Sequence, residues 1–145
     1  MRSHRLAIPV LVALFTAGCA DPFGTLRSPL RAPDLQAISV FFEQLGSDRR
    51  IDTVAAGEVV MVMVRTVCAG EFFYYQVAVT ANGDTVSNGE EGCSGDGRGW
   101  GAGGMSWSPP GPGAYHFMAV LDADNRFAET NEANNTATGT LVVLP

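Results

Sequence analysis

Apolar side chains recur at every second residue in several short stretches of this chain, and this period of two restricts the fold more than any other feature of the sequence. Residues of a β-strand point alternately to opposite faces, so such stretches predict strands with one buried face. The clearest of them is the apolar run from Val59 to Val67. Its uniformly β-branched side is the predicted core face, made of Val60, Val62 and Val64. The opposite side mixes two methionines with an arginine and is expected to face outward or to be half-covered.

Four further stretches show the same alternation. Their apolar positions are Ile38, Val40 and Phe42; Phe73, Tyr75, Val77 and Val79; Tyr115, Phe117, Ala119 and Leu121; and Leu141 and Val143. Turn-forming sequences separate them, of which Asn82-Gly83 is the strongest hairpin signal. No stretch has a convincing helical period. Short strands at this spacing over about 110 residues predict an all-β fold: an immunoglobulin-like antiparallel β-sandwich of about seven strands, spanning residues 34–145.

A glycine-rich segment interrupts the regular strand pattern. Residues 83–104 contain nine glycines, and much of this segment is expected to be loop or weak edge strand because glycine packs nothing and loses entropy on folding. Gly99 to Gly104 fits the spacing G-x-G-x-x-G, but a dinucleotide-binding loop requires a parallel strand before it and a helix after it. Met-Ser-Trp-Ser-Pro-Pro follows instead, so a strand or loop is predicted here.

The first 18 residues have the features of a signal peptide. Arg2 and Arg5 precede an apolar run from Leu6 to Phe15, which is too short for a stable helix across a bilayer. Small residues directly before Cys19 resemble a bacterial lipobox, which predicts cleavage after residue 18 and a lipid on Cys19. Ordinary cleavage with Cys19 as a plain thiol is the alternative. Residues 19–33, which contain three prolines, are expected to tether the domain to the membrane.

The mature chain is expected to be acidic. Two of the nine basic residues lie in the signal peptide, which leaves seven against fifteen acids and a formal net charge of −8. Nucleic acid and anionic lipid both require positive charge on the protein, so neither is an expected partner. Membrane attachment is therefore predicted to come from the lipid on Cys19, in the bacterial cell envelope, with the domain facing the periplasm or the exterior.

Two cysteines remain after Cys19. Cys68 and Cys93 are predicted to form a disulfide, because two cysteines in an exported protein most often pair. A buried thiol at Cys68 or a metal site are the alternatives, although a metal site would require more Cys or His than the single His116 of the mature chain. The bond is expected to pin the glycine-rich segment to the sandwich.

No constellation of catalytic residues stands out. His116 lies between Tyr115 and Phe117 in a predicted strand, on the side opposite the core, where a single His is far more often a surface residue than a base. No serine occupies a Gly-x-Ser-x-Gly elbow. We therefore expect no enzyme and no cofactor.

The segment between the last two predicted strands is dense in short acids and amides. Such side chains hydrogen-bond nearby backbone and tolerate left-handed conformations, so they stabilise turns. The segment resembles the C-terminal motif of the CARDB family, the cell-adhesion-related domain of bacteria. In that motif an Asp and an Asn end one strand, a Glu follows, and Glu-x-x-Asn-Asn opens the last strand. The matching residues are Asp122, Asn125, Glu129, Asn131, Glu132, Asn134 and Asn135.

The resemblance extends to earlier parts of the chain. The further matching positions are Pro33-Asp34-Leu35, Gly57-Glu58, Trp107 with Pro109-Pro110, and Gly113-x-Tyr115. Residues 66–70 depart from the Asn-x-Gly that the family often has after the second strand, and the glycine-rich segment is longer than expected. The resemblance implies an immunoglobulin-like sandwich with a role in adhesion or protein interaction.

The acids of this segment raise the question of calcium. The side chains concerned are Asp122, Asp124, Glu129 and Glu132. Against an EF-hand loop that starts at Asp122, Arg126 falls at position five and Ala133 at position twelve, which excludes that loop. An irregular oxygen cage is the remaining metal hypothesis. We favour a purely architectural connection with no metal, in which Phe127 tucks under the loop.

These observations predict a non-catalytic, lipid-anchored binding or adhesion module of the cell envelope, with an envelope protein or a glycan as its partner. A structural accessory subunit of a larger envelope complex is the alternative. An apolar set on the outer faces of neighbouring strands is either a partner surface or covered by the glycine-rich segment. Its members are Met61, Met63, Phe72 and Tyr74.

Overall fold

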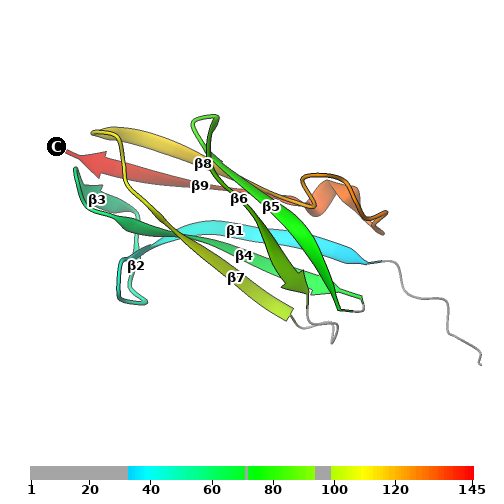
Figure 1. Ribbon diagram of the computed structural model, residues 1–145. Helices are drawn as coiled ribbons and strands as arrows, with labels where there is room; N and C mark the ends of the chain where they lie inside the picture. Colours follow the sequence, from blue (N-terminus) through cyan, green and yellow to red (C-terminus); the bar gives the residue numbers. More distant parts are fainter. Residues whose placement is uncertain (1–32, 71, 94–98) are drawn as a thin grey trace, which may run out of the picture.

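Two β-sheets packed face to face form the molecule in a computed structural model that describes residues 33–70, 72–93 and 99–145, with the side chains of residues 99–103 left out (Figure 1). The first sheet has the order β2 (Arg50–Ile51), β1 (Asp34–Gln44), β4 (Val60–Ala69) and β7 (Gly99–Trp107). The second has the order β3 (Thr53–Ala55), β9 (Thr136–Leu144), β8 (Gly113–Leu121), β5 (Phe73–Ala81) and β6 (Asp84–Cys93). The fold is an immunoglobulin-like β-sandwich, as predicted. The predicted signal peptide, Cys19 and all but the last residue of the tether lie outside the described residues.

Seven of these strands are long, in agreement with the predicted total of about seven. The two short ones, β2 and β3, lie where the chain leaves the first sheet and joins the outer edge of the second. There β3 pairs with β9 in parallel, with Val54 opposite Val143. The prediction of an entirely antiparallel sandwich was therefore wrong for this one pair. Because β3 belongs to a segment that switches sheets, its direction is not set by a hairpin with β9.

Alternating residues of both sheets fill the core. Val60, Val62 and Val64 are at most 2% exposed, which confirms the predicted core face of β4. Phe42 of the first sheet meets Phe117 of the second edge-on, with ring centroids 4.9 Å apart. Burial of each such side chain stabilises the folded state by about 1.5–3 kcal/mol, so these positions dominate the stability of the sandwich.

A β-bulge changes the expected face of one residue. Ile38 was predicted to point inward with Val40 and Phe42, but it is 42% exposed. The pairing of β1 with β4 shifts between Ala37 and Ser39, so that Ile38 is the extra residue. A bulge reverses the alternation locally, and therefore Leu35, before the bulge, reaches the core instead.

The glycine-rich segment forms most of β6 and β7, and each of these is the outer strand of its sheet. The prediction of edge strand is thus confirmed for residues 84–93 and 99–104. The candidate G-x-G-x-x-G lies in β7, which pairs antiparallel with β4 and so provides no dinucleotide-binding loop. Asn82 and Gly83, both with positive φ, form the predicted hairpin turn between β5 and β6.

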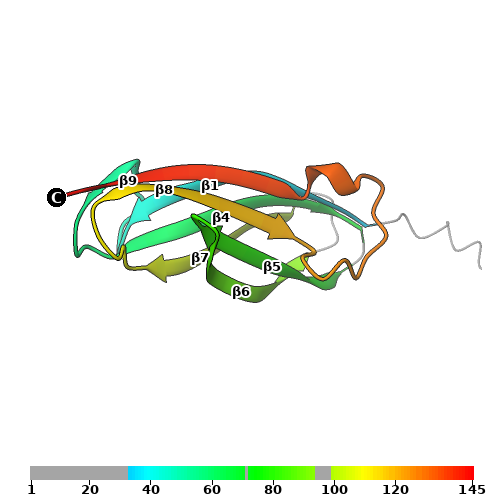
Figure 2. The ribbon, with the colours of Figure 1, turned by 90° about the horizontal axis from the view of Figure 1, so that it is seen from above.

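The two ends of the sandwich carry different connections, and we name them for the argument below (Figures 1 and 2). The near end is the end at which β1 begins; it contains the connection from β8 to β9 and its short 3-10 helix η1 (Glu132–Asn134). The far end is the opposite end; it contains the β5–β6 turn and the β7–β8 connection. At the far end Tyr115 donates a hydrogen bond from its hydroxyl to the Gly111 carbonyl (2.8 Å), the tyrosine corner of immunoglobulin-like folds.

Candidate functional site

Asp122 is the first residue of the β8–β9 connection and is almost fully buried. Its φ of 47° turns the chain out of β8, and its carboxylate accepts hydrogen bonds from the amides of Arg126 (3.0 Å) and Phe127 (2.9 Å). Asn125 takes a second left-handed position at φ 49°, where its own amide bonds the Asp122 carbonyl. Asn and Asp are the side chains that tolerate such conformations best, which explains why the sequence places them here.

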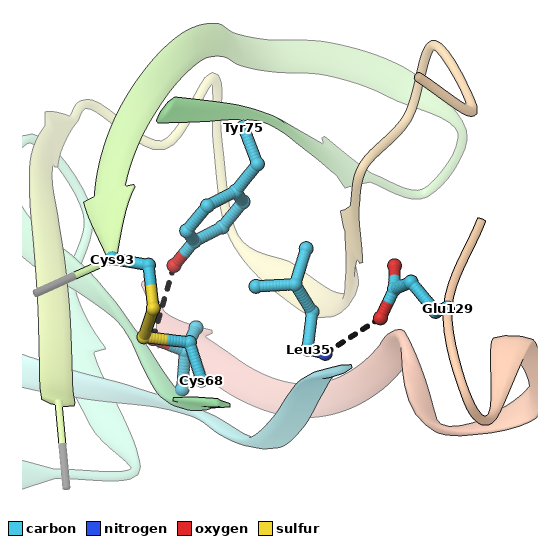
Figure 3. The surroundings of a disulfide bond; sticks show 6 residues. Leu35, Cys68, Tyr75, Cys93 and Glu129 are labelled. Atoms are coloured by element: carbon cyan, nitrogen blue, oxygen red, sulfur yellow. Dashed lines mark hydrogen bonds between the residues drawn. A yellow bond between two sulfur atoms is a disulfide. The ribbon is translucent and has the colours of Figure 1, made fainter. Parts of the chain in front are cut away.

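Glu129 ties the connection to the start of β1 and to the residue just before β9. One carboxylate oxygen accepts the Leu35 amide (2.5 Å) at the start of β1 (Figure 3). The other accepts the Asn135 side-chain amide (2.7 Å) just before β9. Burial raises the pKa of the Glu129 carboxyl above its ordinary value, although these two hydrogen bonds act in the opposite direction. The carboxylate therefore acts as a structural acceptor that connects residues 94 positions apart.

The short helix η1 is held by the other members of the predicted motif. Asn131 caps it by accepting the Ala133 amide (3.1 Å), and Glu132 accepts the Glu129 amide (2.9 Å). The side-chain amide of Asn134 is assigned the orientation in which its nitrogen faces hydrogen-bond acceptors. In this orientation the nitrogen donates to the Leu35 carbonyl (2.9 Å). Every residue of the predicted loop motif thus bonds within the connection or to the start of β1.

Phe127 and Thr130 complete the attachment. The Phe127 ring, partly buried, packs against Phe73 with centroids 4.8 Å apart, in the position expected for the apolar anchor. Thr130 donates its hydroxyl to Asp34 (2.9 Å), and its amide bonds the Pro33 carbonyl (3.3 Å). The connection therefore holds the first residues of the described domain at the near end.

The four acids considered for calcium do not converge. Asp122, Glu129 and Glu132 accept backbone or amide hydrogens, as described above. Asp124 instead bonds Arg126 (2.7 Å), whose guanidinium lowers the pKa of that carboxyl, and Arg126 also reaches Glu90 (3.5 Å). Among the described residues, no three Asp, Glu, His or Cys side chains lie close enough together to hold a metal ion.

The disulfide between Cys68 and Cys93 is present, with Cα atoms 5.9 Å apart (Figure 3). We expected the bond to pin a loop to the sandwich, and this expectation was wrong. Cys93 is the last residue of strand β6 and is fully buried. The bond instead joins β4 of the first sheet to β6 of the second. Beside it the Tyr75 hydroxyl shares a hydrogen bond with Thr66 (3.3 Å), and burial raises the pKa of Tyr75.

The apolar set proposed from the sequence is divided between the two outer faces of the sandwich. Met61 and Met63 lie on the first sheet, where both pack over Gly104 of β7. Tyr74 lies in β5 of the second sheet and Phe72 directly precedes that strand; their rings contact edge-on at 5.1 Å beside Gly92 of β6. The prediction of one patch was wrong, because neighbouring positions in the sequence belong to strands of different sheets. Phe72 and Tyr74 are 64% and 55% exposed.

His116 is exposed on the outer face of the second sheet, opposite the core as predicted, and its Nδ1 lies 3.2 Å from the Thr140 hydroxyl. Nothing in the sequence indicated a different set of residues, Asp84, Trp107 and Tyr115, which line a hollow at the far end. The Asn-Gly turn and the Pro-Pro-Gly-Pro-Gly segment were both visible in the sequence. Only their placement at the same end of the sandwich brings these side chains together.

Comparison with known proteins agrees with this architecture. The CARDB family model matches residues 103–139, which include β8 and the β8–β9 connection. A crystal structure of a CARDB domain from Pyrococcus furiosus, in complex with di-metal ions, is similar with a TM-score of 0.65 and 23% identity, and the match covers 79% of this chain and 91% of that one. A solution structure of the same domain is similar with a TM-score of 0.61 and 24% identity, and the match covers 79% of this chain and 98% of that one.

A third similar structure is a domain of a candidate cell-surface protein from Methanosarcina acetivorans, with a TM-score of 0.54 and 18% identity over 78% of this chain and 93% of that one. No curated protein matches the chain. Among the described residues, no helix is long and apolar enough to cross a membrane. The fold thus places this chain among immunoglobulin-like sandwiches, and residues 103–139 of the chain match the CARDB family model.

Proposed function

We propose that this chain is a non-catalytic binding module of CARDB type, anchored by a lipid on Cys19 to the bacterial cell envelope, with a role related to adhesion. The observation that carries the proposal is the CARDB match at residues 103–139 on a complete sandwich of the same fold. The candidate cell-surface protein of similar fold supports the location. The acidic composition supports attachment through a lipid, because the chain offers no excess of positive charge to anionic headgroups.

The arrangement of polar groups supports a binding role over catalysis. The acids of the β8–β9 connection accept hydrogens from the protein itself, and the His116 ring lies beside the Thr140 hydroxyl on an outer face. Nucleophilic and acid–base catalysis require paired groups within hydrogen-bond reach of one another and of a substrate. A rigid scaffold with differing loops at its two ends is instead the usual frame of a recognition domain.

Fractionation of the host tests the anchor. Cys19→Ser is expected to block maturation or to release the protein from the membrane fraction, whereas the matched tether variant Ser28→Ala stays in that fraction. An acyl mass on the N-terminus of the mature wild-type protein is the second expected result. A membrane fraction unchanged by Cys19→Ser, together with no acyl mass, would refute lipid anchoring.

Purification from the host in detergent tests the binding role. We expect a monomer that captures its partner in a salt-dependent, substoichiometric manner. A stoichiometric, salt-resistant complex would favour the accessory subunit instead. The exposed pair Phe72 and Tyr74 gives that alternative a specific test, because Phe72→Ser with Tyr74→Ser would dissolve a constitutive interface built on these rings.

A further inference from the structure

A cavity of about 280 Å³ opens at the far end of the sandwich, between the β5–β6 turn and the β7–β8 connection. Its apolar part comes from Val86, Trp107, Pro110 and Tyr115, and its polar part includes Asp84 and Ser108. Pockets that bind small groups are typically concave, mostly apolar and equipped with a few polar groups. At this volume the cavity fits a single side chain better than a large ligand.

Both walls of the cavity are fixed in place. On one side Asn82 makes three hydrogen bonds with β8: its amide to the His116 carbonyl (2.9 Å), its side-chain oxygen from the His116 amide (2.8 Å), and its side-chain nitrogen to the Ala114 carbonyl (3.3 Å). On the other side the Tyr115 hydroxyl holds Gly111. A site whose walls are already ordered loses less conformational entropy when a ligand enters.

The aromatic residues and the carboxylate favour a cation. Trp107 and Tyr115 contact edge-on at 4.9 Å with an interplanar angle of 70°, so their two rings form a corner. A cation is attracted to aromatic faces, most strongly to that of Trp. Among the described residues that line the cavity, none is basic. An anionic ligand would therefore meet Asp84 without a compensating positive charge.

Asp84 has no internal partner among the described residues. Three of the described arginines contact other groups: Arg126 pairs with Asp124 and Glu90, Arg49 bonds Gln44, and Arg50 lies over the Phe41 ring at 4.0 Å. The chain contains no lysine. This contrasts with the near end, where the acids of the connection all accept hydrogen bonds.

We propose that the far-end cavity binds an arginine side chain presented by a partner protein. Guanidinium is planar, stacks on aromatic rings, is weakly hydrated and forms directed hydrogen bonds to a carboxylate, so it suits this combination better than an ammonium group does. The inference deepens the proposed binding role and rests on it, since it names the chemistry by which a partner is recognised. Asp84 supplies the charge, and Trp107 with Tyr115 supplies the stacking surface.

A peptide titration tests the cavity directly. The probe is the capped pentapeptide Gly-Gly-Arg-Gly-Gly, added to full-length protein in detergent, and the control probe carries citrulline, a neutral isostere, in place of arginine. We expect the arginine peptide to shift the Trp107 indole resonance and its fluorescence, measured in a Trp100→Phe background. The citrulline peptide should bind at least about fivefold more weakly, because it lacks the charge attracted to ring and carboxylate.

Asp84→Asn is the decisive variant because it removes one charge from a surface position and leaves the shape of the side chain. It should weaken arginine-peptide binding at least about fivefold, whereas the matched variant Asp48→Asn, at an exposed position that does not line the cavity, should not. Equal binding of the two peptides, no shift at Trp107, or unchanged affinity in Asp84→Asn would overturn the inference. So would binding of a neutral oligosaccharide that the arginine peptide does not displace. A host partner that copurifies equally with wild type and Asp84→Asn would contradict this site alone and leave the proposed binding role intact.

Discussion

The two ends of the sandwich use their acidic side chains in opposite ways. At the near end, Asp122, Glu129 and Glu132 all accept hydrogens from the protein itself, and the disulfide closes the two sheets beside them. At the far end, Asp84 faces a hollow lined by aromatic rings and has no partner among the described residues. The near end is the richer in acids and amides, and it is the end that resembles a site in the sequence.

The comparison teaches that the density of polar residues is a poor guide to a binding site. A buried polar group without a partner costs about 1–3 kcal/mol, so a connection that buries several must satisfy them internally. Those groups are then unavailable to a ligand. The carboxylate that remains available, Asp84, lies at the far end, where Asn82 and Tyr115 hold the turns and no bond to Asp84 is needed. The predictions below test this division, from the largest expected effect to the smallest.

Loss of the disulfide should have the largest effect on stability. Replacing both Cys68 and Cys93 by Ala is expected to lower the free energy of unfolding by about 2–4 kcal/mol, because the bond closes a loop with a sequence separation of 25 and joins the two sheets. Urea denaturation measures it. Two alkylatable thiols in non-reduced protein exported to the periplasm would contradict the bond itself.

Removal of the Glu129 carboxylate should come next. Glu129→Ala leaves the Leu35 amide and the Asn135 side chain without their acceptor, which should cost about 2 kcal/mol. Glu132→Ala is the matched control, because it removes one bond at an exposed position and should cost less. If the two variants unfold at the same urea concentration, the connection does not depend on Glu129.

The titration of Glu129 should contribute to the pH dependence of the unfolding free energy. Since its folded pKa is raised above the ordinary value of 4.5, the folded state holds this proton more tightly than the unfolded chain does. Its contribution to stability is therefore fully present below pH 4.5 and is lost as the pH rises through the folded value. The difference in unfolding free energy between wild type and Glu129→Gln, measured from pH 4 to 7, should change in that direction. A difference independent of pH would show that the carboxyl titrates alike in both states.

Calcium should change the melting temperature very little. A ligand that binds only the native state raises stability by mass action, and the acids of the near end already serve as acceptors for the protein's own amides. Differential scanning fluorimetry with calcium and with a chelator measures this. A rise of many degrees that Glu132→Gln abolishes would show that the near end is a metal site.

Asp84→Asn should have the smallest effect on stability, within about 0.5 kcal/mol, because the side chain lies on the surface and makes no hydrogen bond or ion pair with another described residue. The same variant should weaken arginine-peptide binding, as argued above. A large loss of stability would place Asp84 in the framework of the fold, and the contrast between the two ends would fail.

Much of the fold could be predicted because its signals are local. Period-two alternation identified the core sides of β4, β5 and β8, and Asn82-Gly83 identified the hairpin turn. The predictions failed where a residue depends on distant pairing. Ile38 was placed in the core because a bulge leaves no local mark in an apolar stretch, and Cys93 was placed in a loop because glycine content does not distinguish a loop from an edge strand.

The sequence by itself determined that this chain forms strands, located the Asn82-Gly83 turn, and gave the apolar face of β4, β5 and β8, because these properties follow from neighbours within a few residues. It also predicted the disulfide between Cys68 and Cys93, since only two cysteines follow Cys19, but it left a buried thiol or a metal site as alternatives. The tertiary structure alone decided which sheet each strand joins. That assignment divides Met61 and Met63 from Phe72 and Tyr74, makes the disulfide a link between sheets, and unites Asp84 with Trp107 and Tyr115. Sheet membership is set by packing and hydrogen bonds between residues far apart in the chain, and no local pattern encodes them.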